Sequence, residues 1–110
     1  MSDSREIKLV KLTSKSRYQR LLNRDSETYG IKAGHVILKP GENIGRHTTG
    51  EYEEVIVVLK GSGELKLDGR DVSKIGSNTI LYIPPQTFHD VRNIGIRKLE
   101  YIFITSKAIK

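Results

Sequence analysis

The middle of this chain brings together residue types that bind transition metals. In the segment GENIGRHTTGEYEEVIVVLKG (41–61), the histidine His47 is followed seven residues later by the carboxylate Glu54. A further histidine, His89, comes directly after the segment IPPQTF, whose two prolines indicate a rigid turn. Two imidazoles and one carboxylate with open coordination positions suit Fe(II), Mn or Ni. We therefore treat His47, Glu54 and His89 as candidate ligands.

These side chains need a scaffold, and the pattern of the chain from Tyr29 onward predicts one built from strands. Short segments rich in Ile, Val, Leu, Thr and Tyr alternate with breaks such as KPGEN, GSG, LDGR and PPQ, which is typical of an antiparallel sandwich or barrel. The Asp-Gly pair at 68–69 indicates a tight hairpin. About eight strands in one domain predict an all-β jelly roll. The strands are expected at 30–38, 45–49, 53–60, 63–67, 70–74, 79–83, 87–92 and 97–105.

We expect a short segment outside the barrel at each end of the chain. We expect a basic N-terminal extension over 1–28, the barrel over 29–106 and a short tail over 107–110. Within the extension, SRYQRLLNR (16–24) is the one segment for which we predict a helical turn, because Tyr18, Leu21 and Leu22 can share a helix face.

Strand geometry predicts that the candidate ligands converge. Successive side chains of a strand point to opposite faces, so His47 and Thr49 share a face. The next strand begins near Glu54, which can return to that same face. Glu53 should then point away from the site. His35 is the remaining imidazole, and we do not expect it to act as a ligand.

One strand predicts an interface. EVIVVLK (54–60) is apolar on both faces, whereas a surface strand of a monomer normally alternates apolar and polar residues. Its outer face should be covered by the N-terminal segment or by a second subunit. Our hypothesis is a homodimer packed sheet to sheet.

Composition excludes several classes of chemistry. The 110 residues contain no cysteine, which excludes disulfides, thiolate metal sites and a cysteine nucleophile. No phosphate-binding loop or dinucleotide-binding glycine pattern occurs, so no nucleotide cofactor is expected. No segment has the length of a membrane span or the pattern of a signal peptide, and we expect a cytoplasmic protein without membrane contact. The net charge of +6 is concentrated near the N-terminus; we interpret this as a solvated segment and keep nucleic-acid binding as the last of three hypotheses.

The spacing of the central residues resembles that of small single-domain cupins. The first cupin motif has the form G-x5-H-x-H-x4-E-x6-G, and the second has the form G-x5-P-x-G-x2-H-x3-N. In this chain the second histidine of the first motif is replaced by a threonine, and both glycines of the second motif are replaced. The corresponding residues are Gly41, His47, Thr49, Glu54 and Gly61, followed by Asn78, Pro84, Gln86, His89 and Asn93.

The resemblance implies one divalent metal (Fe, Mn, Ni or Zn) inside the barrel, held by His47, Glu54 and His89, and a small organic ligand. Thr49 is a weak neutral ligand that can at best hold a metal-bound water. Small cupins of this kind resemble isomerases, epimerases and dioxygenases, and the sequence leaves open whether catalysis occurs. The alternative is a metal-free cupin that acts as a small-molecule binding or sensor module. The residues expected to line the ligand cavity are Thr49, Tyr52, Tyr82, Gln86, Tyr101 and Phe103, although core packing also explains most of the aromatic ones.

Overall fold

The computed structural model describes residues 5–13, 15–68 and 72–109, and these residues form strands, turns and extended segments without a helix. The expected strands are present, with bounds moved by at most two residues. Residues 70–71 of the strand expected at 70–74, and Gly69 of the expected Asp-Gly hairpin, lie outside the described residues. The strands are β1 (Tyr18–Leu22), β2 (Lys32–Leu38), β3 (His47–Thr48), β4 (Tyr52–Lys60), β5 (Ser62–Leu67), β6 (Val72–Gly76), β7 (Thr79–Ile83), β8 (Phe88–Arg92) and β9 (Leu99–Lys107).

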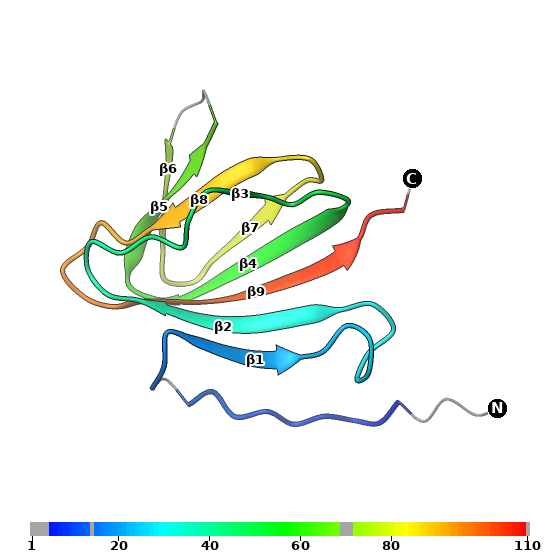
Figure 1. Cartoon of the computed structure of the whole chain (residues 1–110). Helices are drawn as coiled ribbons and strands as arrows, with labels where there is room; N and C mark the ends of the chain where they lie inside the picture. Colours follow the sequence, from blue (N-terminus) through cyan, green and yellow to red (C-terminus); the bar gives the residue numbers. More distant parts are fainter. Residues whose placement is uncertain (1–4, 14, 69–71, 110) are drawn as a thin grey trace.

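The strands form two antiparallel sheets that face each other (Figure 1). One has five strands in the order β1-β2-β9-β4-β7, and the other has four in the order β3-β8-β5-β6. Neighbours in space are often distant in sequence, as when β2 and β4 both pair with the C-terminal strand β9. This arrangement confirms the predicted all-β jelly-roll barrel, also called a double-stranded β-helix.

The helical turn expected over 16–24 is wrong, because residues 18–22 form the edge strand β1. Tyr18 pairs with Val36 of β2, and its ring stacks on that of Phe103 with centroids 6.2 Å apart. The open edge of β2 offers backbone hydrogen bonds that an isolated helical turn cannot match, so tertiary pairing overrides the local pattern. The domain boundary expected at residue 29 stays a prediction, although β1 lies before it and belongs to the barrel sheet.

The barrel interior is polar at one end and apolar at the other. On β4 the inward-facing residues run from the carboxylate of Glu54 to the apolar side chains of Ile56 and Val58, and all three are buried. The apolar end forms the hydrophobic core, which fixes the fold, while the end near Glu54 carries polar side chains. The core cluster comprises Val36, Leu38, Ile56, Val58, Leu65, Ile75, Ile83, Val91, Leu99 and Tyr101.

Several motif positions outside the ligand set act in turns. Gly61 has φ of +87°, and a Cβ there would lie 2.4 Å from the Lys98 carbonyl oxygen. The buried Asn93 amide donates to the carbonyls of Leu38 and Arg97. Asn78 and Gln86, which replace the two glycines of the second motif, also have positive φ, at 64° and 55°. The backbone therefore keeps the left-handed turns of the glycine-containing motif, at some cost in strain.

The outer face of the five-stranded sheet is apolar and partly exposed. Ile80 and Tyr82 of β7 are 69% and 58% exposed, and Ile104 of β9 is 36% exposed. The N-terminal segment does not cover them, because it runs beside β1, where Gln19 bonds to the backbone of Lys11 and Thr13 (Figure 1). In the described part of the chain, no helix has the length and apolar character needed to cross a membrane.

Candidate metal centre and ligand cavity

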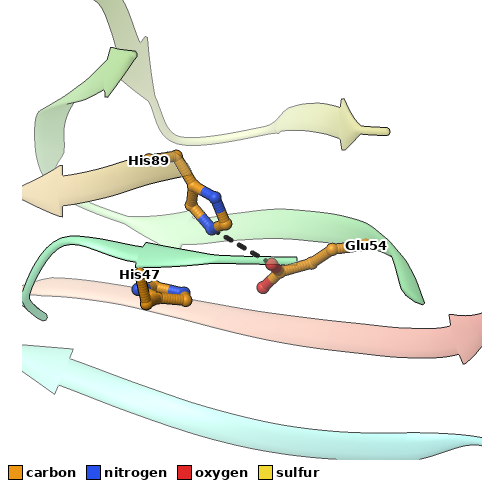
Figure 2. A group of neighbouring side chains, drawn as sticks. All are labelled: His47, Glu54 and His89. Carbon is orange, nitrogen blue, oxygen red and sulfur yellow. Dashed lines mark ion pairs between the residues drawn. The ribbon is translucent and has the colours of Figure 1, made fainter. Parts of the chain in front are cut away.

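The three candidate ligands come together at the polar end of the barrel. His47 on β3 pairs directly with His89 on β8, and Glu54 reaches them from β4 in the opposite sheet. One potential ligand atom from each residue lies within 4.8 Å of the others. The two imidazole centroids are 4.2 Å apart, and Figure 2 shows the three side chains directed toward a common centre. The convergence expected from strand alternation is therefore present.

Backbone carbonyls set the tautomers of both histidines. The Nδ1 atom of His47 lies 2.8 Å from the Gly45 carbonyl oxygen, and that of His89 lies 3.0 Å from the Thr87 carbonyl oxygen. A carbonyl only accepts hydrogen bonds, so each Nδ1 carries the proton and donates it. In its neutral form, an imidazole with this tautomer presents the lone pair of Nε2. Such a bond behind a histidine is the usual support of a metal ligand.

The contact between His89 and Glu54 requires a cation. The Nε2 atom of His89 lies 3.2 Å from Glu54 Oε1, but the two atoms are not aligned for a hydrogen bond. Among the described residues, this nitrogen is the buried side-chain polar atom without a hydrogen-bond partner. A lone pair facing a carboxylate is unfavourable unless a proton or a metal ion lies between them. The donor set therefore fits a divalent ion.

Burial and the neighbouring acceptors have opposite effects on the pKa of His89. Burial alone lowers its pKa, but the adjoining Glu54 carboxylate and the Thr87 carbonyl outweigh burial, so that the pKa stands above its ordinary value. A proton can therefore occupy the position between His89 and Glu54 in which a metal ion would bind.

Thr49, at the position of the missing histidine, has a structural role. Its hydroxyl donates to the Pro84 carbonyl at 2.7 Å and accepts from the Thr87 amide at 3.1 Å. The side chain is 8% exposed and ties the segment after β3 to the diproline turn. Its one hydroxyl proton is used in this tie and is not available to a ligand.

A cavity of about 520 Å³ lies beside the three candidate ligands. It is lined by four of the six residues expected to contact a ligand, namely Thr49, Tyr52, Tyr101 and Phe103. Burial, and then the charge of Glu54, raise the pKa of Tyr101 far above that of a free phenol, so its hydroxyl stays protonated.

The Cupin_2 family model, described as a cupin domain, matches residues 25–105. The chain belongs to the cupin family. A curated relative, the polyketide synthase CurC of Streptomyces cyaneus, is 33% identical over 70 residues, which are 64% of this chain and 45% of that protein. The chain therefore matches less than half the length of this relative.

Solved structures support the cupin fold. A Cupin 2 conserved barrel domain protein from Salinispora arenicola superposes with a TM-score of 0.78 at 22% identity, covering 94% of this chain and 91% of the other. A predicted oxalate decarboxylase from Thermotoga maritima gives 0.76 at 20% identity, covering 83% and 79%. At these identities the similarity concerns the fold.

Two expected cavity residues lie elsewhere in this cupin. Tyr82 and Gln86 do not line the cavity beside the candidate ligands but a separate hollow near β5 and β8. The Tyr82 hydroxyl donates to Glu53 on the outer face of the sheet, at 2.8 Å. The reason is strand alternation, because Tyr82 follows the outward direction of its partner Val55 while Ile83 points inward.

The third histidine, His35, pairs with a different carboxylate, that of Glu100. The His35 ring is 1% exposed, and its Nε2 atom lies 3.2 Å from Glu100 Oε1. Both residues lie on the face of the five-stranded sheet opposite to Val36 and Tyr101, which face the interior. His35 is therefore outside the candidate centre, as the sequence predicts.

The basic residues at the cavity were not singled out by sequence analysis. Arg24, which follows β1, and Lys32, at the start of β2, both line the cavity. In the sequence Arg24 was counted with the solvated N-terminal segment. Its placement depends on the pairing of β1 with β2, which no local pattern indicates.

Proposed function

We propose that this cupin binds one divalent transition metal ion (Fe, Mn, Ni or Zn) through His47, Glu54 and His89, and a small organic ligand in the adjoining cavity. The observation that carries the proposal is the buried Nε2 atom of His89, which faces the Glu54 carboxylate without a hydrogen-bond partner among the described residues. The Nδ1 bonds of both histidines support it, because they leave the Nε2 lone pairs directed at one point.

The proposal extends to an enzyme of the isomerase, epimerase or dioxygenase type. A bound divalent ion supplies Lewis-acid or O2-binding chemistry. The chain's own residues have separate roles in this proposal. Tyr101 provides a neutral phenol at the cavity wall, and Phe103 with Tyr52 provides apolar surface that limits access of water. The structurally similar Thermotoga maritima protein is a predicted oxalate decarboxylase, which is compatible with a small organic substrate.

The second candidate function is a metal-free cupin that binds or senses a small molecule. Thr49 favours it, because its hydroxyl is bonded to the backbone on both sides and supplies no fourth ligand. In that case a protonated His89 forms an ion pair with Glu54, in agreement with the raised pKa of His89.

Metal analysis and a ligand screen separate the two functions. We expect protein purified without chelator to contain about one Fe, Mn, Ni or Zn ion per chain. Chelation should lower the melting temperature, and re-addition of the metal should restore it, because an ion that binds the folded state stabilises it. Stabilisation by sugars or organic acids with no uptake of any of the four metals would instead establish the binding module.

We also propose that the chain forms a homodimer through the outer face of the five-stranded sheet. The face is apolar on both central strands, with Val55 and Val57 on β4 beside Ile102 and Ile104 on β9. Two copies that pack through such a face bury apolar surface. Sedimentation at micromolar concentration should show a dimer, and Ile104→Glu should shift it to a monomer. A wild-type monomer under these conditions would disprove the dimer. The cytoplasmic location, and our expectation that nucleic acid is not the partner, remain predictions.

A further inference from the structure

Two of the basic side chains that line the ligand cavity have no ion-pair partner among the described residues. Three basic side chains line the cavity, namely Arg24, Lys32 and Arg46. Arg46 is committed elsewhere, because its guanidinium forms three hydrogen bonds with the Asp68 carboxylate. Neither Arg24 nor Lys32 forms an ion pair within the described part of the chain. A site that faces two unpaired cations attracts an anion.

Arg24 is held in place before any ligand arrives. Its Nε donates to the Gly30 carbonyl at 3.1 Å, one Nη donates to the Thr105 hydroxyl, and the guanidinium lies over the Tyr52 ring at 4.0 Å. The other Nη makes no hydrogen bond to the described residues. Because three contacts already fix the group, binding an anion there costs little additional side-chain entropy.

Strand register places these cations close to the candidate metal ligands. Thr105 of β9 pairs with Lys32 on one side and with Glu54 on the other. Adjacent strands are about 4.8 Å apart, so the backbones of Lys32 and Glu54 are separated by roughly 10 Å, with Thr105 between them. A small molecule can therefore contact the cations at one end and the His47–Glu54–His89 group at the other.

The cavity wall between the two ends is aromatic. Phe103 and Tyr18 line it with stacked rings. Both rings lie against Gly34, where a Cβ would come within 2.5 Å of Phe103 and 2.7 Å of Tyr18. The Lys32 ammonium lies 5.9 Å from the Phe103 ring centre, on the cavity side of the sheet.

We propose that the ligand of this cupin is a small organic acid whose carboxylate binds Arg24 and Lys32. Its body lies against Tyr18 and Phe103, and its other end faces the three candidate metal ligands. A carboxylate matches the planar edge of a guanidinium, and two cations suffice for its charge. The Thr105 hydroxyl accepts from Arg24 and has its own proton available for a carboxylate oxygen. This proposal rests on the proposed small-molecule cavity and names its ligand class.

Calorimetric titration of metal-free protein tests the charge preference without dependence on the metal. Benzoate and benzamide have the same shape and differ in charge, and phenyl phosphate provides the alternative anion. We expect benzoate to bind at least about tenfold more tightly than benzamide, as charge-assisted hydrogen bonds imply. The preference should weaken with added salt. Equal affinity for benzoate and benzamide, or tighter binding of phenyl phosphate than of benzoate, would overturn the proposal.

Variants identify the residues responsible. Arg24→Gln should remove the preference for benzoate, and Lys32→Gln should reduce it. Lys60→Gln is the matched control, because Lys60 is an exposed cation at the other end of β4. An equal loss in the Lys60 variant, or no loss in the Arg24 variant, would contradict the proposal. Zinc stoichiometry, measured in parallel, should not change in these variants. Failure of zinc binding with an intact preference for benzoate would disprove the metal site alone.

Discussion

Replacing both histidines of the candidate centre, His47→Ala together with His89→Ala, should reduce the metal content from about one ion per chain to near zero. Two of the three ligands are then missing, and we expect affinity to fall at least ~1,000-fold, or about 4 kcal/mol. The reason is geometric, because the remaining ligand, Glu54, offers a single buried carboxylate. Elemental analysis after gel filtration and competitive titration with a zinc chelator measure the change.

The chain contains a matched control for this experiment. His35 is also buried and also lies 3.2 Å from a carboxylate, that of Glu100, but on the opposite face of the sheet. His35→Ala should destabilise the fold while leaving the metal content unchanged. A double variant with glutamine in place of both site histidines guards against unfolding, since it preserves polar side chains. Full metal content in either folded double variant would show that the ion binds elsewhere.

Restoring the missing imidazole with Thr49→His should raise metal affinity by about 100-fold, or ~2.7 kcal/mol. Position 49 lines the same cavity as the three candidate ligands, so an imidazole there supplies a fourth ligand, which is the third nitrogen. The same substitution should destabilise the metal-free protein by about 1–3 kcal/mol, because the Pro84 carbonyl and the Thr87 amide lose their hydrogen-bond partner. Metal titration and urea unfolding measure the two effects separately.

Thr49→Val separates the two effects of that substitution. Valine has nearly the shape of threonine and lacks the hydroxyl, so it should reproduce the loss of stability without any gain in affinity. If Thr49→His binds metal no more tightly than the wild type, then position 49 does not face the centre. The threonine would in that case be a structural tie whose replacement by histidine is not accommodated.

The fold was predictable because its signals are local. Turn residues at regular spacing marked the strands, and alternation along β4 indicated that Glu54 faces inward with Ile56 and Val58. Alternation also directs His47, Glu54 and His89 into the barrel interior, the two histidines from one sheet and Glu54 from the other. Asn78 and Gln86, which replace glycines of the second motif, have the positive φ of those turn positions.

Other features depend on contacts between distant segments. Residues 18–22 have a pattern compatible with a helix, and only the free edge of β2 makes them a strand. That pairing brings Arg24 and Lys32 to the cavity, where Thr105 joins them to Glu54. Tyr82 faced outward for a similar reason, because its direction follows from its register with β4.

By itself, then, the sequence determined the jelly roll and the three residues that meet at its polar end, because strand period and turn chemistry act over a few residues. Only the tertiary structure decided how the site is completed. It assigned the Thr49 hydroxyl to the backbone, left the His89 Nε2 facing a carboxylate, and set two cations at the cavity wall. The physical reason is that hydrogen-bond partners and uncompensated charges depend on which strands pair, and such pairing joins residues as far apart as Arg24 and Thr105.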